Sequence, residues 1–396
     1  MKNKRALLLI GWLATAGILD AQSFYMVSKQ QQFLQTSAAG VVADPLGGFK
    51  FQAKAATNVS LTVPGGATLP FVFEVNDRDY ALRQYFPTKS ALDAAFPSGT
   101  YRITGANIPA ISLTLAADNY PVVTPQVISA TNGTWNNGGV LVIDPAQATT
   151  LTFSTFSGYA TSGVAGHINF YLTGMTESGT SLETDVFSQP FSGQPATPSP
   201  LTTFTIPAGR LVSGRVYRAW LDFDTIVTMD STTVPGSSVG TLFSKEVTFY
   251  IGAQAPGTST PPPVITVAPT SRTAPIGGSV TFSVDVTVGG ATFSFQNSNH
   301  IPLGFNWTHN GRNLGDMSAA GGKYTNPGTG VALTINSLTA ADAGDYIVTI
   351  CTAGGVVISS PATLSIGAST APVITTQPRG ATVNAGSTVA LTAGTA

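Results

Sequence analysis

The chain has 396 residues, and its composition excludes several classes of protein before any motif is considered. Charged residues make up only 9%, and 18 basic and 19 acidic side chains leave a net charge of −1. Without a basic or acidic field, the chain is not expected to bind nucleic acid or an anionic membrane through charge. A single cysteine excludes an internal disulfide framework. A hydrophobic content of 43% is enough for packed cores, and the length favours two to four domains.

Residues 1–21 have the anatomy of a secretory signal peptide. Three basic residues within 1–5 precede an apolar run at 6–19 and a small residue, Ala21. The run is shorter than the ~20 residues that a membrane-spanning helix needs, although an uncleaved N-terminal anchor is the alternative. The sequence therefore predicts a mature chain that is secreted or displayed at the cell surface and is not inserted into a membrane.

Residues 22–118 are interpreted as a β-rich module of no recognised family. Alternating apolar and polar residues predict half-buried strands, and these runs are 49–51, 59–63, 71–75, 101–104 and 111–115. One short helix is expected at 90–96. Its N-cap would be Ser90, with Asp93 three residues further on as the acid of a capping box.

Residues 119–253 form a second predicted module. Its strands are expected at 120–123, 149–156, 167–172, 201–206, 216–223 and 246–251. Leu211 and Tyr217, with Gly214 between them, give an L-x-x-G-x-x-Y spacing. This spacing resembles the E–F corner of fibronectin type III domains. The resemblance implies that Leu211 packs inward and that the Tyr217 hydroxyl bonds back to the backbone of the corner.

Residues 264–366 lie between two linkers rich in Pro, Gly, Ser and Thr, at 254–263 and 367–372. Segments matching the B, C, E and F strands of an immunoglobulin-like domain follow in order, at 277–284, 305–307, 331–335 and 342–348. The module resembles immunoglobulin-like domains of the intermediate type, such as the tandem modules of bacterial surface proteins. The fold class predicted for the chain is therefore all-β, with tandem β-sandwich modules joined by Pro-rich linkers.

The module departs from its family at the disulfide. Val284 and Val348 stand where the two core cysteines belong, and Trp307 stands where the family has a buried tryptophan. The resemblance implies that the valines face each other across the core and that Trp307 packs against both. Asp342 and Tyr346 are expected to form the tyrosine corner of the domain.

Residues 373–396 repeat the start of this module. Val264-Ile265-Thr266 recurs as Val373-Ile374-Thr375, 109 residues further on. The match extends along both copies as far as Val280 in the first, which corresponds to Val389 in the second. A fixed period of this size predicts tandem sandwich modules. The second copy is expected to comprise only its first two strands, so the chain is interpreted as a fragment of a longer protein or as the product of a truncated gene model.

Residue types that carry catalysis are few. The histidines His167, His300 and His309 have no metal-binding spacing and are expected at the surface or at the rim of a strand, so no cofactor is implied. Cys351 is expected to face outward as a semi-exposed thiol, with an intermolecular disulfide as the alternative.

The carboxylates Asp222 and Asp224, and Asp77 and Asp79, are expected to decorate solvent-facing surfaces. Calcium binding or glycosidase chemistry are the alternatives. Trp135 lies in a polar, glycine-rich segment, where its ring is expected to fold over its own loop or to stack on a sugar.

These features favour a non-catalytic secreted or cell-surface modular protein that is structural, adhesive or ligand-presenting. Its partner would be a protein or a polysaccharide, not further identified. One alternative is a set of spacer or carbohydrate-binding modules accessory to a larger extracellular carbohydrate-active enzyme. A second alternative is that residues 22–118 form an enzyme.

Overall fold

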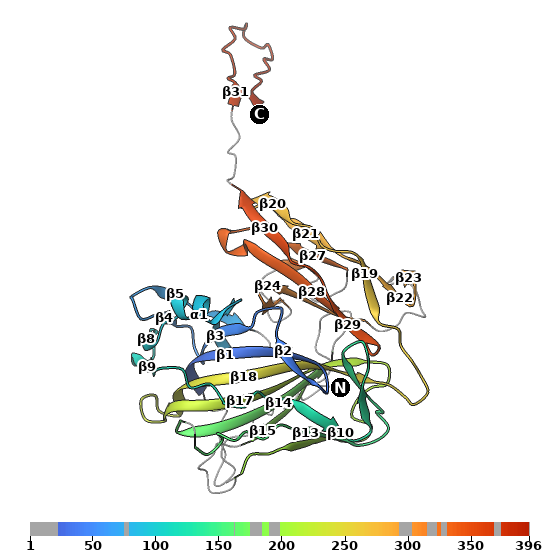
Figure 1. Ribbon diagram of the computed structural model, residues 1–396. Helices are drawn as coiled ribbons and strands as arrows, with labels where there is room; N and C mark the ends of the chain where they lie inside the picture. Colours follow the sequence, from blue (N-terminus) through green and yellow to red (C-terminus); the bar gives the residue numbers. More distant parts are fainter. Residues whose placement is uncertain are drawn as a thin grey trace, which may run out of the picture.

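The computed structural model describes residues 23–74, 79–161, 163–174, 184–189, 199–292, 303–314, 323–325, 331–367 and 374–395. These residues are mostly in β-strands, with a single short α-helix, which confirms the predicted fold class. The strands of one long sheet lie within residues 23–253, and a β-sandwich follows it in the chain (Figure 1). Among the described residues, no helix has the length and apolar character needed to cross a membrane.

The long sheet is formed by segments from both ends of residues 23–253. In spatial order its strands are β15 (Thr184–Gln189), β14 (Ala165–Gly174), β17 (Val216–Asp230), β18 (Ser237–Ala253), β1 (Ser23–Ser37), β3 (Phe49–Ala55), β7 (Asp79–Phe86) and β6 (Val72–Glu74). β2 (Gly40–Ala43), β11 (Gly133–Trp135) and β12 (Val140–Ile143) extend it at one end.

β1 and β18 lie side by side and run parallel, from the pair Ser23 and Ser237 to the pair Leu34 and Thr248. The sheet therefore crosses the predicted module boundary at 118/119 without a break. β12 also pairs with β18 in parallel, directly beyond the end of β1, with Val140 beside Tyr250. Since β1 is the first described strand and β18 the last strand before the sandwich, this pairing closes residues 23–253 into one unit.

Two smaller sheets cover the inner face of the long sheet and enclose two cores. The sheet of β5 (Thr68–Pro70), β4 (Ser60–Thr62), β8 (Gly99–Thr104) and β9 (Ile111–Leu115) covers one half. The sheet of β10 (Val127–Ala130), β13 (Thr149–Phe153) and β16 (Thr203–Ile206) covers the other. Each core includes residues of β18, Phe243 in the first and Phe249 in the second. The two predicted modules thus have their own cores but share a sheet.

The helix α1 (Lys89–Ala95) begins one residue earlier than expected and has a different cap. The Thr88 hydroxyl accepts a hydrogen bond from the Ala91 N–H at 3.2 Å, as an N-cap does. The predicted cap, Ser90, is instead inside the helix. Asp93 is therefore not the acid of a capping box, and its carboxylate points to lysine side chains.

The first linker connects β18 to the β-sandwich. The sandwich begins at β19 (Pro263–Val267) and ends at β30 (Ala362–Gly367). One of its sheets contains β20 (Arg272–Pro275), β30, β28 (Gly344–Thr352), β24 (Gly304–His309) and β25 (Arg312–Asn313), with β29 (Gly355–Ile358) beside β28. The facing strands are β21 (Val280–Ser283), β27 (Ala332–Ile335) and β26 (Tyr324–Thr325), then β19, β22 (Asp285–Val288) and β23 (Ala291–Thr292).

The core of this sandwich contains the three residues that the immunoglobulin resemblance singles out. Trp307 on β24 is 0% exposed and lies directly beside Val348 of β28. Val284, between β21 and β22, is also buried and belongs to the same hydrophobic cluster from the facing side. Two facing sheets with a buried tryptophan between them define an immunoglobulin-type β-sandwich, which here has valines in place of a disulfide.

Both tyrosine corners are present as hydrogen bonds. The Tyr346 hydroxyl donates to the Asp342 carbonyl oxygen at 2.8 Å. The Asp342 carboxylate accepts hydrogen bonds from the Thr339 N–H at 2.6 Å and from Lys323 Nζ at 2.6 Å. In the preceding unit, the Val212 N–H donates to the Tyr217 hydroxyl oxygen at 2.8 Å. Next to this corner, the buried Leu211 packs into the second core.

The repeat at the end of the chain forms less structure than its counterpart. β31 (Ile374–Thr376) and β32 (Gly394–Thr395) pair with each other, and residues 377–393 form no strand. Val389 and Leu391 are exposed, whereas the residues they repeat, Val280 and Phe282, are buried. Among the described residues, the predicted strands of the second copy are therefore not reproduced beyond β31, and the apolar side chains that would face a core are exposed.

Trp307→Ala should destabilise the sandwich by about 3–5 kcal/mol, because it removes a fully buried ring and leaves a cavity. Urea denaturation of the full chain, followed by circular dichroism, would measure the change. Val264→Ala, at a half-exposed position of the same sandwich, is the control and should cost little. A Trp307→Ala variant as stable as the control would contradict this core assignment.

Candidate functional site

The outer face of the long sheet carries a continuous band of polar side chains. In register across the strands, His167 is followed by Asp224, Ser244, Gln30 and Lys50. The neighbouring row contains Asn169, Asp222, Glu246 and Gln32. Most of these side chains are buried although they lie on a polar face. Buried polar groups must be paired, so the band is expected to be a hydrogen-bonded network.

The network centres on two carboxylates of β17. Asn169 Nδ2 donates to Asp222 Oδ2 at 2.9 Å and to Asp224 Oδ2 at 3.2 Å. His167 Nδ1 lies 3.1 Å from Asp224 Oδ2, and the Ser244 hydroxyl donates to Asp224 Oδ1. Because the serine hydroxyl donates to the carboxylate and not to the imidazole, this arrangement does not activate a nucleophile in the way a Ser–His–Asp triad does.

Negative charge accumulates in this band. Desolvation raises the pKa of Asp222 well above its usual range, and the neighbouring Asp224 and Glu246 add to the shift. Lys50 Nζ, 3.5 Å from Glu246 Oε2, opposes it. Among the described residues, no group of three or more His, Cys, Asp or Glu side chains is arranged to hold a metal ion.

The expectations for Asp224 and His167 are wrong. Asp224 and His167 are buried, because the polar face of the sheet is densely packed, and do not decorate a solvent-facing surface. His309 is half-buried and stacks on the Tyr346 ring, with centroids 4.5 Å apart. Asp79 forms an ion pair with Lys54 at 3.1 Å. Asp77 and His300 lie outside the described residues.

Trp135 lies on strand β11 and not in a loop. It pairs in register with Leu141 of β12, and its half-buried ring packs against the second core. The ring centroid is 6.3 Å from that of Phe249. The ring therefore packs on a core and does not fold over its own loop as expected, because β12 attaches the segment to β18. Part of the ring remains exposed.

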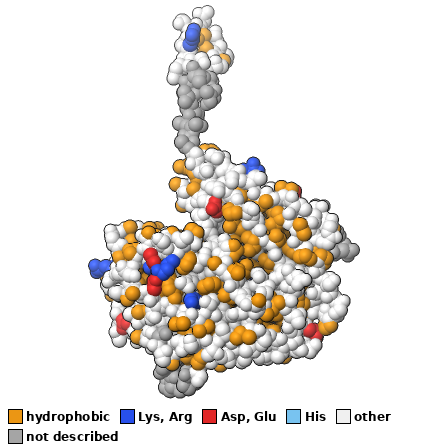
Figure 2. Space-filling view, in the orientation of Figure 1, with side chains coloured by type: hydrophobic (Ala, Val, Ile, Leu, Met, Phe, Trp, Pro, Cys, Tyr) orange, Lys and Arg blue, Asp and Glu red, His pale blue; other side chains and the backbone are white. Residues whose placement is uncertain are grey.

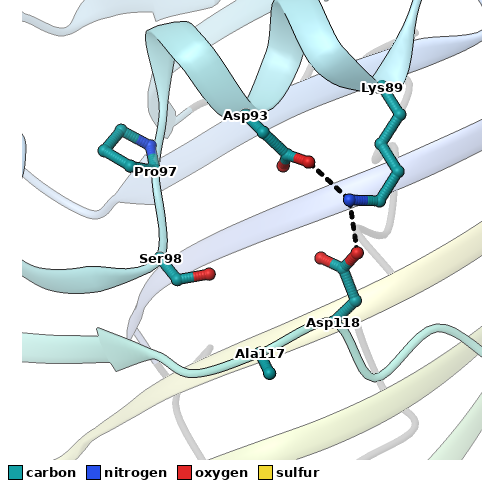
Figure 3. Close-up of a pocket in the computed structure, with 6 residues that line it drawn as sticks. All are labelled: Lys89, Asp93, Pro97, Ser98, Ala117 and Asp118. Carbon is teal, nitrogen blue, oxygen red and sulfur yellow. Dashed lines mark hydrogen bonds and ion pairs between the residues drawn. The ribbon is translucent and has the colours of Figure 1, made fainter.

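A pocket of about 350 Å³ opens beside α1, and Figure 3 shows its lining. It is lined by Lys89, Asp93, Pro97, Ser98, Ala117 and Asp118. The Lys89 ammonium pairs with one oxygen of Asp93 and with Asp118, and these hydrogen bonds raise the pKa of Lys89. Desolvation would raise the pKa of Asp93, but hydrogen bonds from Lys29 and Lys89 lower it overall.

The sandwich is docked on the end of the long sheet through an apolar cluster. Leu34, Val140 and Tyr250 of the sheet pack there with Cys351 and Ala353 of the sandwich. Cys351 faces away from the core of its own sandwich, as its strand parity indicates. The expectation of a semi-exposed thiol is nevertheless wrong, because the neighbouring sheet covers it and leaves it 0% exposed. Burial raises the pKa of this thiol to about 12.

Polar contacts surround this apolar cluster. Asn136 Nδ2 donates to the carbonyl oxygens of Ala353 and Gly354, each at 3.1 Å. The Val356 N–H donates to the Gly138 carbonyl oxygen at 3.0 Å. A Cβ atom on Gly138 would lie 2.2 Å from the Gly354 oxygen, so only glycine permits this approach. The loop after β11 and the turn after β28 therefore fit each other closely.

A buried carboxylate joins the sandwich to the first half of the long sheet. Glu74 on β6 is 1% exposed and pairs with Arg83 of β7 and with Arg312 of β25, the latter at 2.6 Å. The turn before Arg312 is Asn310-Gly311, with φ values of 48° and 81°. Asn-Gly suits the left-handed backbone of such a two-residue hairpin turn. Arg83 belongs to the same sheet as Glu74, whereas Arg312 reaches it from the sandwich, so the Arg312–Glu74 ion pair crosses the joint.

Comparison with protein-family models and with curated proteins found no match. Among solved structures, titin domain M4 is similar at 22% identity over 28% of this chain and 100% of that chain, with a TM-score of 0.21. The Ig1–2 module of the Drosophila receptor protein tyrosine phosphatase DLAR shows 13% identity over 62% and 100%, with a TM-score of 0.23. Titin domains I67–I69 show 12% identity over 87% and 99%, with a TM-score of 0.22. Scores of this size do not establish a common fold, and the sandwich assignment rests on its strand pairing.

Asp222→Asn should stabilise the chain at pH 8, because the amide carries no charge whose burial opposes folding. The folded-state pKa of Asp222 is raised, so the wild type is favoured at low pH and loses stability as pH rises through that pKa. The difference between variant and wild type should therefore vanish near pH 4. Urea titrations at both pH values would measure it, with the exposed Asp285→Asn as control. A gain that is the same at both pH values would contradict the assignment.

Proposed function

We propose that the chain is a non-catalytic, exported modular protein that holds its β-sandwich modules in a fixed arrangement and presents their surfaces to a protein or polysaccharide partner. The proposal places the chain outside the cytoplasm, either secreted or at the cell surface, on the basis of the basic and apolar segments at 1–21. Loops at the ends of β-sandwiches are exposed and suit such presentation.

The observation that carries the proposal is the interface at the end of the long sheet. A flexible chain of modules would leave the residues on either side of its linkers exposed. Here an apolar cluster containing Cys351 and the buried Glu74 with its two arginines span the joint. The first linker is also held, because the Thr352 hydroxyl donates to the Pro261 carbonyl oxygen at 2.8 Å. These contacts favour a rigid unit over independent modules.

The burial of titratable groups also supports a structural role. Asp222, Asp224, Glu74 and Lys29 are each engaged with oppositely charged or hydrogen-bonding side chains of other strands or of α1. Such pairs fix which segments meet, since a misplaced partner would leave a buried charge uncompensated. Charged residues in this chain therefore serve assembly of the fold.

Expressed with its own leader, the chain is expected outside the cytoplasm with Gln22 as its N-terminal residue.

In the exported protein, the Cys351 thiol should be unreactive towards a thiol reagent until the chain is unfolded. Arg312→Met should raise the native reaction rate about ten-fold or more, since a loss of 1.4 kcal/mol at the joint corresponds to a factor of ten. N-terminal sequencing and a timed labelling assay would provide both results.

Arg272→Met, at an exposed position of the same sandwich, is the matched control and should leave the rate unchanged. A wild-type thiol that reacts as fast in the native chain as in urea would contradict a fixed joint. A chain that keeps Met1 and stays in the cytoplasm would contradict the proposed location.

A further inference from the structure

Lys29 is a buried charged residue that lies among the apolar side chains of the first core. Its side chain is 1% exposed, and in the sheet it lies between Phe51 of β3 and Phe243 of β18, both 0% exposed. The Phe51 ring stacks on Phe96, with ring centroids 3.7 Å apart. Tyr25 and Val27, the preceding residues on the same face of β1, are also buried in this core. An amine here is withdrawn from water almost completely.

The amine is paired with a carboxylate of helix α1. Lys29 Nζ lies 2.6 Å from Asp93 Oδ1. Asp93 is held in place because its helix neighbours Leu92 and Phe96 are buried in the same core. Burying an ion pair costs more than it returns in many proteins, and a well-packed hydrophobic pair is often at least as stable.

The second oxygen of Asp93 faces a different environment. It pairs with the Lys89 ammonium at the pocket beside α1, and Lys89 is held by Asp118 (Figure 3). The Asp93 carboxyl group thus has a buried amine on one oxygen and an exposed cation on the other. A cation at this place can stabilise negative charge that develops on the oxygen when the carboxyl carbon is attacked. The pocket offers a route for a released water molecule.

We propose that Lys29 and Asp93 form an intramolecular amide cross-link. In the ion pair, a proton passes from Lys29 Nζ to the Asp93 carboxylate, which gives a neutral amine and a carboxylic acid. The nitrogen lone pair attacks Cγ and forms the N–C bond. The C–O bond to the protonated oxygen then breaks, and that oxygen leaves as water with the second proton from nitrogen. No oxidant, reductant or other reactant is needed.

The surroundings favour each part of this step. The apolar core around Lys29 disfavours its charged ammonium and so favours the neutral amine that acts as the nucleophile. Fixing the amine against the carboxyl group removes the entropy cost of bringing them together. The product joins β1 to α1 across 64 residues of sequence, in a chain whose single cysteine excludes an internal disulfide.

Mass spectrometry of the full chain under denaturing conditions tests the proposal directly. The wild type should be lighter than its sequence mass by one water, counted from whatever N-terminus the sample carries. A protease digest should contain a branched peptide that joins the segments of Lys29 and Asp93. Lys29→Met, which keeps a long apolar stem, should restore the full mass and remove the branched peptide, and so should Asp93→Ala.

Lys50→Met is the matched control. Lys50 is also a largely buried lysine on a strand of the same sheet, paired with Glu246, but it lies on the outer face. This variant should keep both the missing water and the branched peptide. A wild-type chain with its full sequence mass and no branched peptide would overturn the cross-link and leave Lys29 and Asp93 as a buried ion pair. That result would not affect the proposed function, which rests on the joint around Cys351.

Discussion

The parallel pairing of β1 with β18 is the contact on which the rest of the architecture depends. It brings residues 23–34 beside residues 237–248 and so joins strands that are more than two hundred positions apart. Without it, β3, β7 and β6 would form a separate sheet from β14, β15 and β17. The outer-face band, which runs from His167 to Lys50, exists only because the two sets of strands are continuous. The apolar cluster under the sandwich likewise needs Leu34 of β1 and Tyr250 of β18 together.

Charged side chains are scarce in this chain, and several are concentrated where segments must meet. Lys29 and Asp93 join β1 to α1, Glu74 joins β6 and β7 to the sandwich through Arg83 and Arg312, and Glu246 joins β18 to Lys50 of β3. Hydrophobic contacts supply most of the burial but discriminate poorly between partners. Buried ion pairs discriminate strongly between correct and incorrect partner segments, because an incorrect partner leaves a buried charge uncompensated. The chain thus combines generic apolar cores with a small number of specific polar joints.

The sequence predicted local features better than contacts between distant segments. The immunoglobulin-type strands around Trp307 and the strands at 101–104 and 111–115 follow from alternation and turn residues, which act over short distances. β1 was not among the predicted strands, because Lys29 and the glutamines at 30–32 interrupt the alternation of apolar and polar residues on which the other strands were predicted. No local pattern shows that Lys29 is inward-facing until Phe51 and Phe243 are known to flank it.

The site residues show the same limit. The alternation of residues along its strand correctly predicted that Cys351 faces away from the core of its own sandwich. Its burial could not be predicted, since the covering residues Leu34 and Val140 belong to another part of the chain. Asp222 and Asp224 were expected in solvent because alternation indicates which face of a strand a residue occupies but not what packs on that face. Glu74 and Arg312 carry no motif at all, and only the docking of the sandwich brings them together.

Hydrogen exchange at the β1–β18 pair tests the central claim, that residues 23–253 fold as one unit around this parallel contact. If the claim holds, the slowest amides of β1 and of β18 should exchange with the same opening free energy and the same denaturant dependence, as members of one cooperative unit do. Peptides covering residues 25–34 and 239–248, followed by mass spectrometry over increasing urea, would give both values. If β1 opens at a distinctly lower free energy while β18 stays protected beside β17, the shared sheet is not the element that holds the two halves together.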